Sequence, residues 1–130
     1  MKLLNFDKLY IIGFLCIIFW TCTDMGTESP LTAPEITIHY SVDIQPIFDA
    51  NCIECHGNTS GLSLTSYEEF INGGDHGNTV IPGNSEESVI VQKLGENPPF
   101  GERMPNGLPP LDPPLIDLIK TWIDSGAENN

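Results

Sequence analysis

The sequence predicts an all-α domain of four short helices joined by long loops. Apolar residues recur at the i, i+3, i+4 spacing of a helix face in several segments. Most of the 12 glycines and 11 prolines of the chain lie between those segments and predict irregular connections. A 130-residue chain suggests a single domain, and one so rich in loops needs a source of stability beyond its own side chains.

The first predicted helix carries the apolar stripe Ile44, Ile47 and Phe48. Pro46 lies inside this stripe, and its missing N–H is tolerated only in the first turn of a helix. Asp43 is therefore the predicted N-cap, because it places Pro46 in that turn. The helix then continues into Cys52.

Three further helices follow along the chain. A capping box at residues 65–68 begins the second, and Gly73 ends it. Asn84 is the predicted cap of the third, which has acidic residues in its first turn and ends at Gly95. The fourth runs from residues 113–114 to Gly126, and we expect it to cross the first helix. Its apolar stripe is Leu115, Leu118, Ile119, Trp122 and Ile123.

The first helix leads into the motif Cys52-Ile53-Glu54-Cys55-His56. On a helical turn, positions i, i+3 and i+4 share a face, so both thiols and the imidazole can meet one flat cofactor. Cys-x-x-Cys-His is the attachment signature of a c-type haem, in which the thiols form thioethers and the histidine binds iron. The motif predicts one covalently bound haem c, held by Cys52, Cys55 and His56.

A bare Cys-x-x-Cys has other interpretations. It is also found in redox dithiols and as half of a zinc site, and a five-residue match can arise by chance. A zinc site needs two more ligands, and the sequence has no second cysteine pair or His-x-His cluster. A thioredoxin-like dithiol usually lies in a βαβ pattern, which is also absent.

Met104 is the candidate for the sixth iron ligand, given haem on His56. It follows the haem motif by about fifty residues and lies in a charged, proline-stiffened loop, where packing into a core is less expected than a fixed thioether. His39 and His76 are expected at the surface. Arg103 could neutralise a haem propionate or simply be solvated.

The N-terminus predicts export. Residues 1–22 form a signal segment in which an unbroken apolar run of 12 residues, 9–20, is too short to span a membrane. Cys22 follows directly, at the position of a lipoprotein cysteine, although plain cleavage and an uncleaved anchor remain alternatives. Residues 23–40 form a polar, proline-containing tether, and residues 41–130 the folded domain. Lipid on Cys22 would anchor the protein on the periplasmic or cell-envelope side of a membrane.

The net charge of −13 excludes nucleic acid as a natural partner, because no basic patch is present. It favours a redox partner protein with a basic docking surface. Simple solubility of a surface protein explains the same charge.

The chain resembles the class I c-type cytochromes, and more closely the small planctomycete-type cytochrome c domains. The resemblance covers about residues 42–127. It is carried by the Cys-x-x-Cys-His motif at 52–56, by Met104-Pro105, and by weaker segments at 42–47, 61–64, 80–83 and 119–127. It implies a small cytochrome c-like fold in which His56 and Met104 bind iron axially and the terminal helices cross over the haem, with Phe48 and Trp122 near the crossing.

A six-coordinate iron leaves no open site for a substrate, so the resemblance implies a one-electron carrier rather than an enzyme. No small-molecule substrate is then expected. The alternative is a haem-based ligand sensor or peroxidase-like protein in which Met104 dissociates. A third possibility is a haem module held within a larger surface complex.

Overall fold

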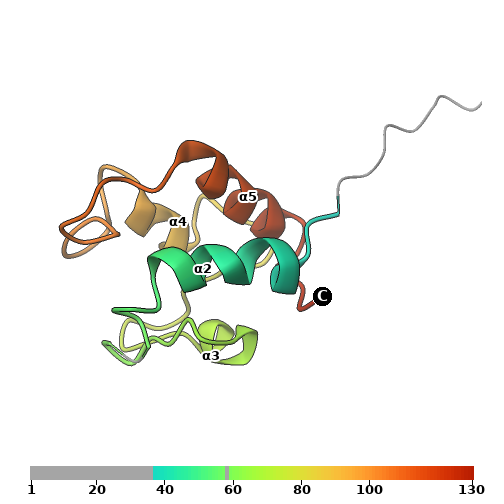
Figure 1. The fold of residues 1–130 in the computed structure, drawn as a ribbon, viewed down its shortest axis with the longest axis horizontal. Helices are drawn as coiled ribbons and strands as arrows, with labels where there is room; N and C mark the ends of the chain where they lie inside the picture. Colours follow the sequence, from blue (N-terminus) through green and yellow to red (C-terminus); the bar gives the residue numbers. More distant parts are fainter. Residues whose placement is uncertain (1–36, 58) are drawn as a thin grey trace, which may run out of the picture. The chain divides into compact units, whose positions relative to one another are not determined.

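The computed structural model describes residues 37–57 and 59–130, and the described chain is helical with no β-strand. Its helical elements are drawn in Figure 1. They are η2 (Tyr40–Ile44), α2 (Gln45–Asn51), α3 (Tyr67–Asn72), α4 (Val89–Leu94) and α5 (Pro113–Asp124). The π-helical turn η2 runs straight into α2, so the predicted all-α fold of four short helices is confirmed.

The predicted N-terminal segments fall largely outside the described residues. The signal segment 1–22, its candidate lipid site Cys22 and the tether up to residue 36 are not described. The described end of the tether packs onto the domain, because Tyr40 is buried and its backbone N–H donates to Asn130 Oδ1 at 2.8 Å. No helix in residues 37–57 and 59–130 is long and apolar enough to cross a membrane.

The first helix begins earlier than predicted, and Asp43 is not its N-cap. Residue His39 takes that position, and its N–H donates to the Asp43 carboxylate at 2.8 Å. The N–H of Gln45 bonds to the carbonyl of Tyr40, which is the wider π-helical pattern. Pro46 lies in the first turn of α2, as predicted, so its missing N–H falls where the hydrogen-bond pattern changes.

An aromatic cluster joins the first helix to the last. The ring of Tyr40 on η2 lies 5.3 Å from Trp122 on α5, and that of Phe48 lies 5.0 Å from Phe70 on α3. Phe70 in turn stacks on Trp122 at 6.2 Å. The crossing of the terminal helices is thus made by η2 and α5, which lie side by side in Figure 1.

The third helix begins later than predicted. Asn84 caps only a single turn, because its Oδ1 accepts from the N–H of Glu87 at 3.2 Å and α4 begins at Val89. Ser88 interrupts the helix between them. Its hydroxyl, fully buried, accepts from the N–H of Ile81 at 2.8 Å and donates to the carbonyl of Asn84 at 2.8 Å.

We expect Ser88→Ala to lower the free energy of unfolding of the holoprotein by about 1–3 kcal/mol, because it removes the buried hydroxyl that accepts from the N–H of Ile81 and donates to the carbonyl of Asn84. Chemical denaturation followed by circular dichroism measures the loss. Thr121→Ala is the matched control, since that hydroxyl bonds its own helix at an exposed position and should change stability by less than about 0.5 kcal/mol. Equal losses of stability in the two variants would contradict a stabilising role for the Ser88 hydroxyl.

Candidate functional site

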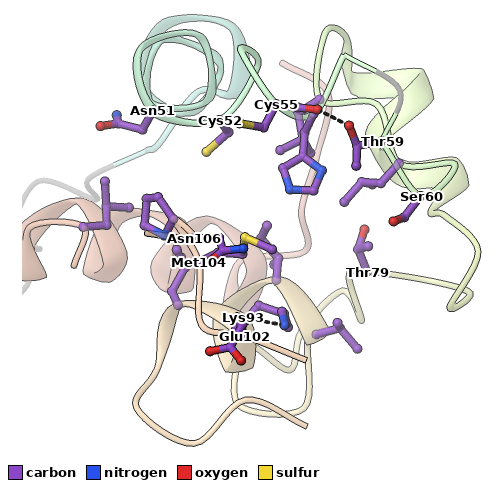
Figure 2. Close-up of a pocket in the computed structure, with 18 of the residues that line it drawn as sticks. Asn51, Cys52, Cys55, Thr59, Ser60, Thr79, Lys93, Glu102, Met104 and Asn106 are labelled. Atoms are coloured by element: carbon purple, nitrogen blue, oxygen red, sulfur yellow. Dashed lines mark hydrogen bonds between the residues drawn. The ribbon is translucent and has the colours of Figure 1, made fainter. Parts of the chain in front are cut away.

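The four predicted haem-binding residues line one cavity of about 720 Å³. Cys52, Cys55 and His56 come from the turn that follows α2, and Met104 comes from the long loop between α4 and α5. Figure 2 shows the Met104 sulfur on a different wall of the open space from Cys52 and Cys55. The volume falls within the range of about 300–1,000 Å³ that is typical of ligand pockets.

Backbone hydrogen bonds fix the turn that carries the Cys-x-x-Cys-His motif. Cys52 ends α2, with its N–H donating to the carbonyl of Phe48 at 2.8 Å. The carbonyl of Cys52 then accepts from Cys55 N–H at 3.1 Å and His56 N–H at 2.8 Å. The carbonyl of His56 is held by Leu64 N–H at 2.9 Å. The three side chains therefore share one face, as the spacing predicts.

The imidazole of His56 is suited to bind a metal. Burial, and then the nearby charge of Lys93, lowers the pKa of His56, so the ring is neutral at pH 7 and keeps a lone pair free. Its Nδ1 is buried and has no hydrogen-bond partner among the described residues. No carbonyl of residue 57 or of residues 59–63 therefore accepts a hydrogen bond from Nδ1.

The alternatives to haem for the cysteine pair are disfavoured. Burial, and then the charge of Cys55, raises the pKa of the Cys52 thiol to about 11, whereas reactive dithiols have lowered thiol pKa values. Both thiols are free rather than disulfide-bonded. Within residues 37–57 and 59–130, no three His, Cys, Asp or Glu side chains are grouped to hold a metal ion, which disfavours zinc.

Met104 is held in the cavity wall by its own backbone. Its N–H donates to the carbonyl of Lys93, at the end of α4, at 2.7 Å. Its carbonyl accepts from Arg103 Nη1 at 3.1 Å, and Arg103 Nη2 reaches the carbonyl of Leu108 at 3.0 Å. Arg103 does not itself line the cavity, so the structure gives it a role in shaping the loop rather than in meeting a propionate.

Two loops close a further wall. The N–H of Asp75 donates to the carbonyl of Ser60 at 2.9 Å. A Cβ on Gly74 would lie 2.9 Å from that same carbonyl, so only glycine allows the loops to approach so closely. The neighbouring His76 is exposed, as predicted, but it also lines the cavity, and its ring lies 4.2 Å from that of Phe100.

One feature of the cavity was missed by reasoning from the sequence. The place of Lys93 near the end of the third predicted helix indicates a favourable interaction with the helix dipole, yet its side chain is buried and lines the cavity. Its position between the apolar residues Val91 and Leu94 was the available signal. Phe48 and Trp122, expected near the crossing, lie in the aromatic cluster that joins the first and last helices, and they do not line the cavity.

The donor set fits a covalently attached haem. A neutral imidazole and a thioether suit iron, and two thiols are available to the vinyl groups. The remaining walls are largely apolar, as a porphyrin requires. They include Leu62, Leu64, Val89, Ile90, Leu94, Leu111 and Leu115.

Comparison with known proteins gives a family match over part of the chain. The family described as Planctomycete cytochrome C matches residues 52–106. Among solved structures, hydrazine synthase of Kuenenia stuttgartiensis is similar, with 26% sequence identity and a TM-score of 0.48. That likeness covers 72% of this chain but only 17% of the hydrazine synthase chain. No curated protein matches the sequence. The matched range begins at Cys52 and ends just past Met104, so the part of the chain that carries the candidate haem-binding residues is similar to the Planctomycete cytochrome C family, which supports a c-type cytochrome.

Proposed function

We propose that the protein is an exported monohaem cytochrome that carries one electron, with His56 and Met104 as the axial ligands of the iron. The observation that carries the proposal is the single cavity lined by Cys52, Cys55, His56 and Met104. The volume of about 720 Å³ supports one haem. A bound haem supplies a reversible one-electron iron couple.

The residues of the chain account for carrier behaviour rather than catalysis. Neutral His56 offers one axial donor, and Met104, held by its backbone on the loop, offers the other. A haem iron held by both residues would have no position left for a substrate. A methionine ligand favours the ferrous state relative to a second histidine, and the apolar walls limit access of water.

The test is a spectroscopic titration of the purified holoprotein. We expect a low-spin, six-coordinate spectrum in both oxidation states and a single transition that fits one electron. Mass spectrometry of the mature protein should show the mass of one haem. A five-coordinate, high-spin spectrum, or carbon monoxide binding by the reduced wild type at neutral pH, would instead support the ligand-sensor or peroxidase-like alternative.

We further propose that the exported domain is anchored by lipid on Cys22, after removal of the signal segment. Support comes from the short apolar run at residues 9–20 and from the position of Cys22 directly after it. The same mass spectrum decides the point, because lipid adds a characteristic mass to the N-terminal cysteine. A mature N-terminus elsewhere would overturn the anchor without affecting the haem assignment.

The proposed redox partner carries a basic surface with an apolar centre. Carboxylates on exposed residues lie among those that line the cavity, namely Glu54, Asp75, Glu102 and Asp112. Two exposed apolar side chains, Phe100 and Leu108, lie among them. Such a face attracts a positively charged partner and then buries apolar surface against it.

Electron transfer to a small cationic metal complex should therefore slow about tenfold between low ionic strength and about 0.5 M salt, because salt screens the attraction. Stopped-flow mixing measures the rate. Glu54→Gln combined with Glu102→Gln should reduce both the rate at low salt and its salt dependence. Glu87→Gln removes an equally exposed charge that does not line the cavity, and it should change the rate less. Equal effects of the two sets would contradict docking at this face.

A further inference from the structure

Lys93 is a buried cation whose partners are backbone carbonyls. Its side chain is 9% exposed, and a buried ammonium is costly unless its donors are satisfied. Within the described residues the one ion pair joins Lys120 to Glu86, so no carboxylate neutralises Lys93. Its Nζ instead donates to the carbonyl of Phe100 at 2.6 Å and to that of Glu102, the contact drawn in Figure 2.

The other end of the same residue binds the same loop. The carbonyl of Lys93 accepts from the N–H of Met104 at 2.7 Å. The Nζ also lies 4.8 Å from the centre of the Phe100 ring, within the range of a cation–π contact. Lys93 thus contacts the loop at residues 100, 102 and 104. These residues are the segment that leads up to the Met104 thioether and Met104 itself.

The helix behind Lys93 is anchored in the core. Val91 and Leu94 of α4 are buried, and α4 packs against α5. Arg103 ties the loop only to itself, through the carbonyls of Met104 and Leu108. Lys93 instead bonds the loop to a helix that packs in the core. The position of Met104 therefore depends on the position of α4.

We infer that Lys93 is a positioning residue for Met104: its ammonium and its carbonyl together hold the loop so that the thioether stays in the wall of the cavity that His56 shares. The inference rests on the proposed function, in which Met104 is the sixth ligand. The charge of Lys93 also reaches the site, since it contributes to the lowered pKa of His56. A fixed positive charge near the iron favours the ferrous state.

The test compares Lys93→Leu, Lys93→Arg and Lys120→Leu as holoproteins. Lys93→Leu keeps the apolar stem and removes the ammonium, so the loop loses its tie and Met104 dissociates more often. We expect carbon monoxide binding by the reduced variant to rise at least tenfold over wild type. We also expect the equilibrium constant for reduction to fall about tenfold, which is about 59 mV for a one-electron couple. Lys93→Arg, which keeps the charge and donors, should recover most of both properties, and Lys120→Leu should match wild type.

A merely structural role would lower the melting temperature and leave ligand binding and potential unchanged, and that result in Lys93→Leu would overturn the inference. If Lys93→Leu does not fold, hydrogen exchange of the wild-type holoprotein decides instead. The N–H of Met104 should exchange at least a hundredfold more slowly than an open loop amide, and exchange at the open-loop rate overturns the inference. Carbon monoxide binding by the wild type itself would mean that the proposed methionine ligation has failed, rather than the role of Lys93.

Discussion

Replacing Met104 with alanine should convert the reduced holoprotein into a five-coordinate form that binds carbon monoxide at neutral pH. The methyl group of alanine cannot reach or bind iron, while His56 and both thioethers remain. The loop should keep its course, because the Lys93 and Arg103 bonds to residue 104 use backbone atoms. A methionine ligand favours ferrous iron, so its loss should lower the reduction potential by at least about 59 mV. That shift corresponds to a tenfold fall in the equilibrium constant for reduction.

Met104→His is the control that separates ligand chemistry from damage to the loop. An imidazole at this position should restore a six-coordinate, low-spin spectrum and exclude carbon monoxide, yet keep the potential below that of wild type. Visible spectra and a redox titration of the three proteins measure these differences. If Met104→Ala binds no more carbon monoxide than wild type, Met104 is not the sixth ligand.

The helices that carry regular apolar stripes could be predicted from the sequence. The stripe from Leu115 to Ile123 became α5, and its Trp122 meets Tyr40 of η2 in the core. The start of α5 at Pro113 is as predicted, but the starts of the first and third predicted helices could not be predicted, because hydrogen bonds that carry no sequence signature decided them. Ser88 takes the N–H of Ile81 and delays α4, and the π turn before Pro46 moves the first helix start to Tyr40.

The candidate site was also predictable only where local spacing decides the geometry. The spacing of Cys52, Cys55 and His56 sets their common face by local geometry alone, and the structure brings Met104 to the same cavity. The anchoring of Met104 could not be predicted, because it depends on a tertiary contact between Lys93 and carbonyls seven and nine residues away. Carbonyl acceptors carry no sequence signature, since every residue has one.

The double variant Cys52→Ala with Cys55→Ala should lose the covalent haem and, with it, the folded domain. Without haem, the apolar walls of the cavity of about 720 Å³ would face water and lose every packing contact with the porphyrin. The whole net stability of a small domain is about 5–15 kcal/mol. Loss of the contacts of a whole porphyrin is large against that margin, so we expect the remaining core not to hold the walls apart. The helical circular dichroism signal and the cooperative thermal transition should both be lost.

Variants of a single residue in the motif should have a smaller effect on haem retention and folding than the double variant. Cys52→Ala leaves one thioether through Cys55, so a folded holoprotein should accumulate at reduced yield and should retain its haem on a denaturing gel. Glu54→Ala is the matched control within the motif, because it changes the same exposed turn and leaves both thiols in place. If the double variant still unfolds cooperatively without haem, the aromatic core of Tyr40, Phe48, Phe70 and Trp122 is sufficient for folding. The haem would then serve electron transfer alone, and the cavity would have to be largely closed in the apoprotein.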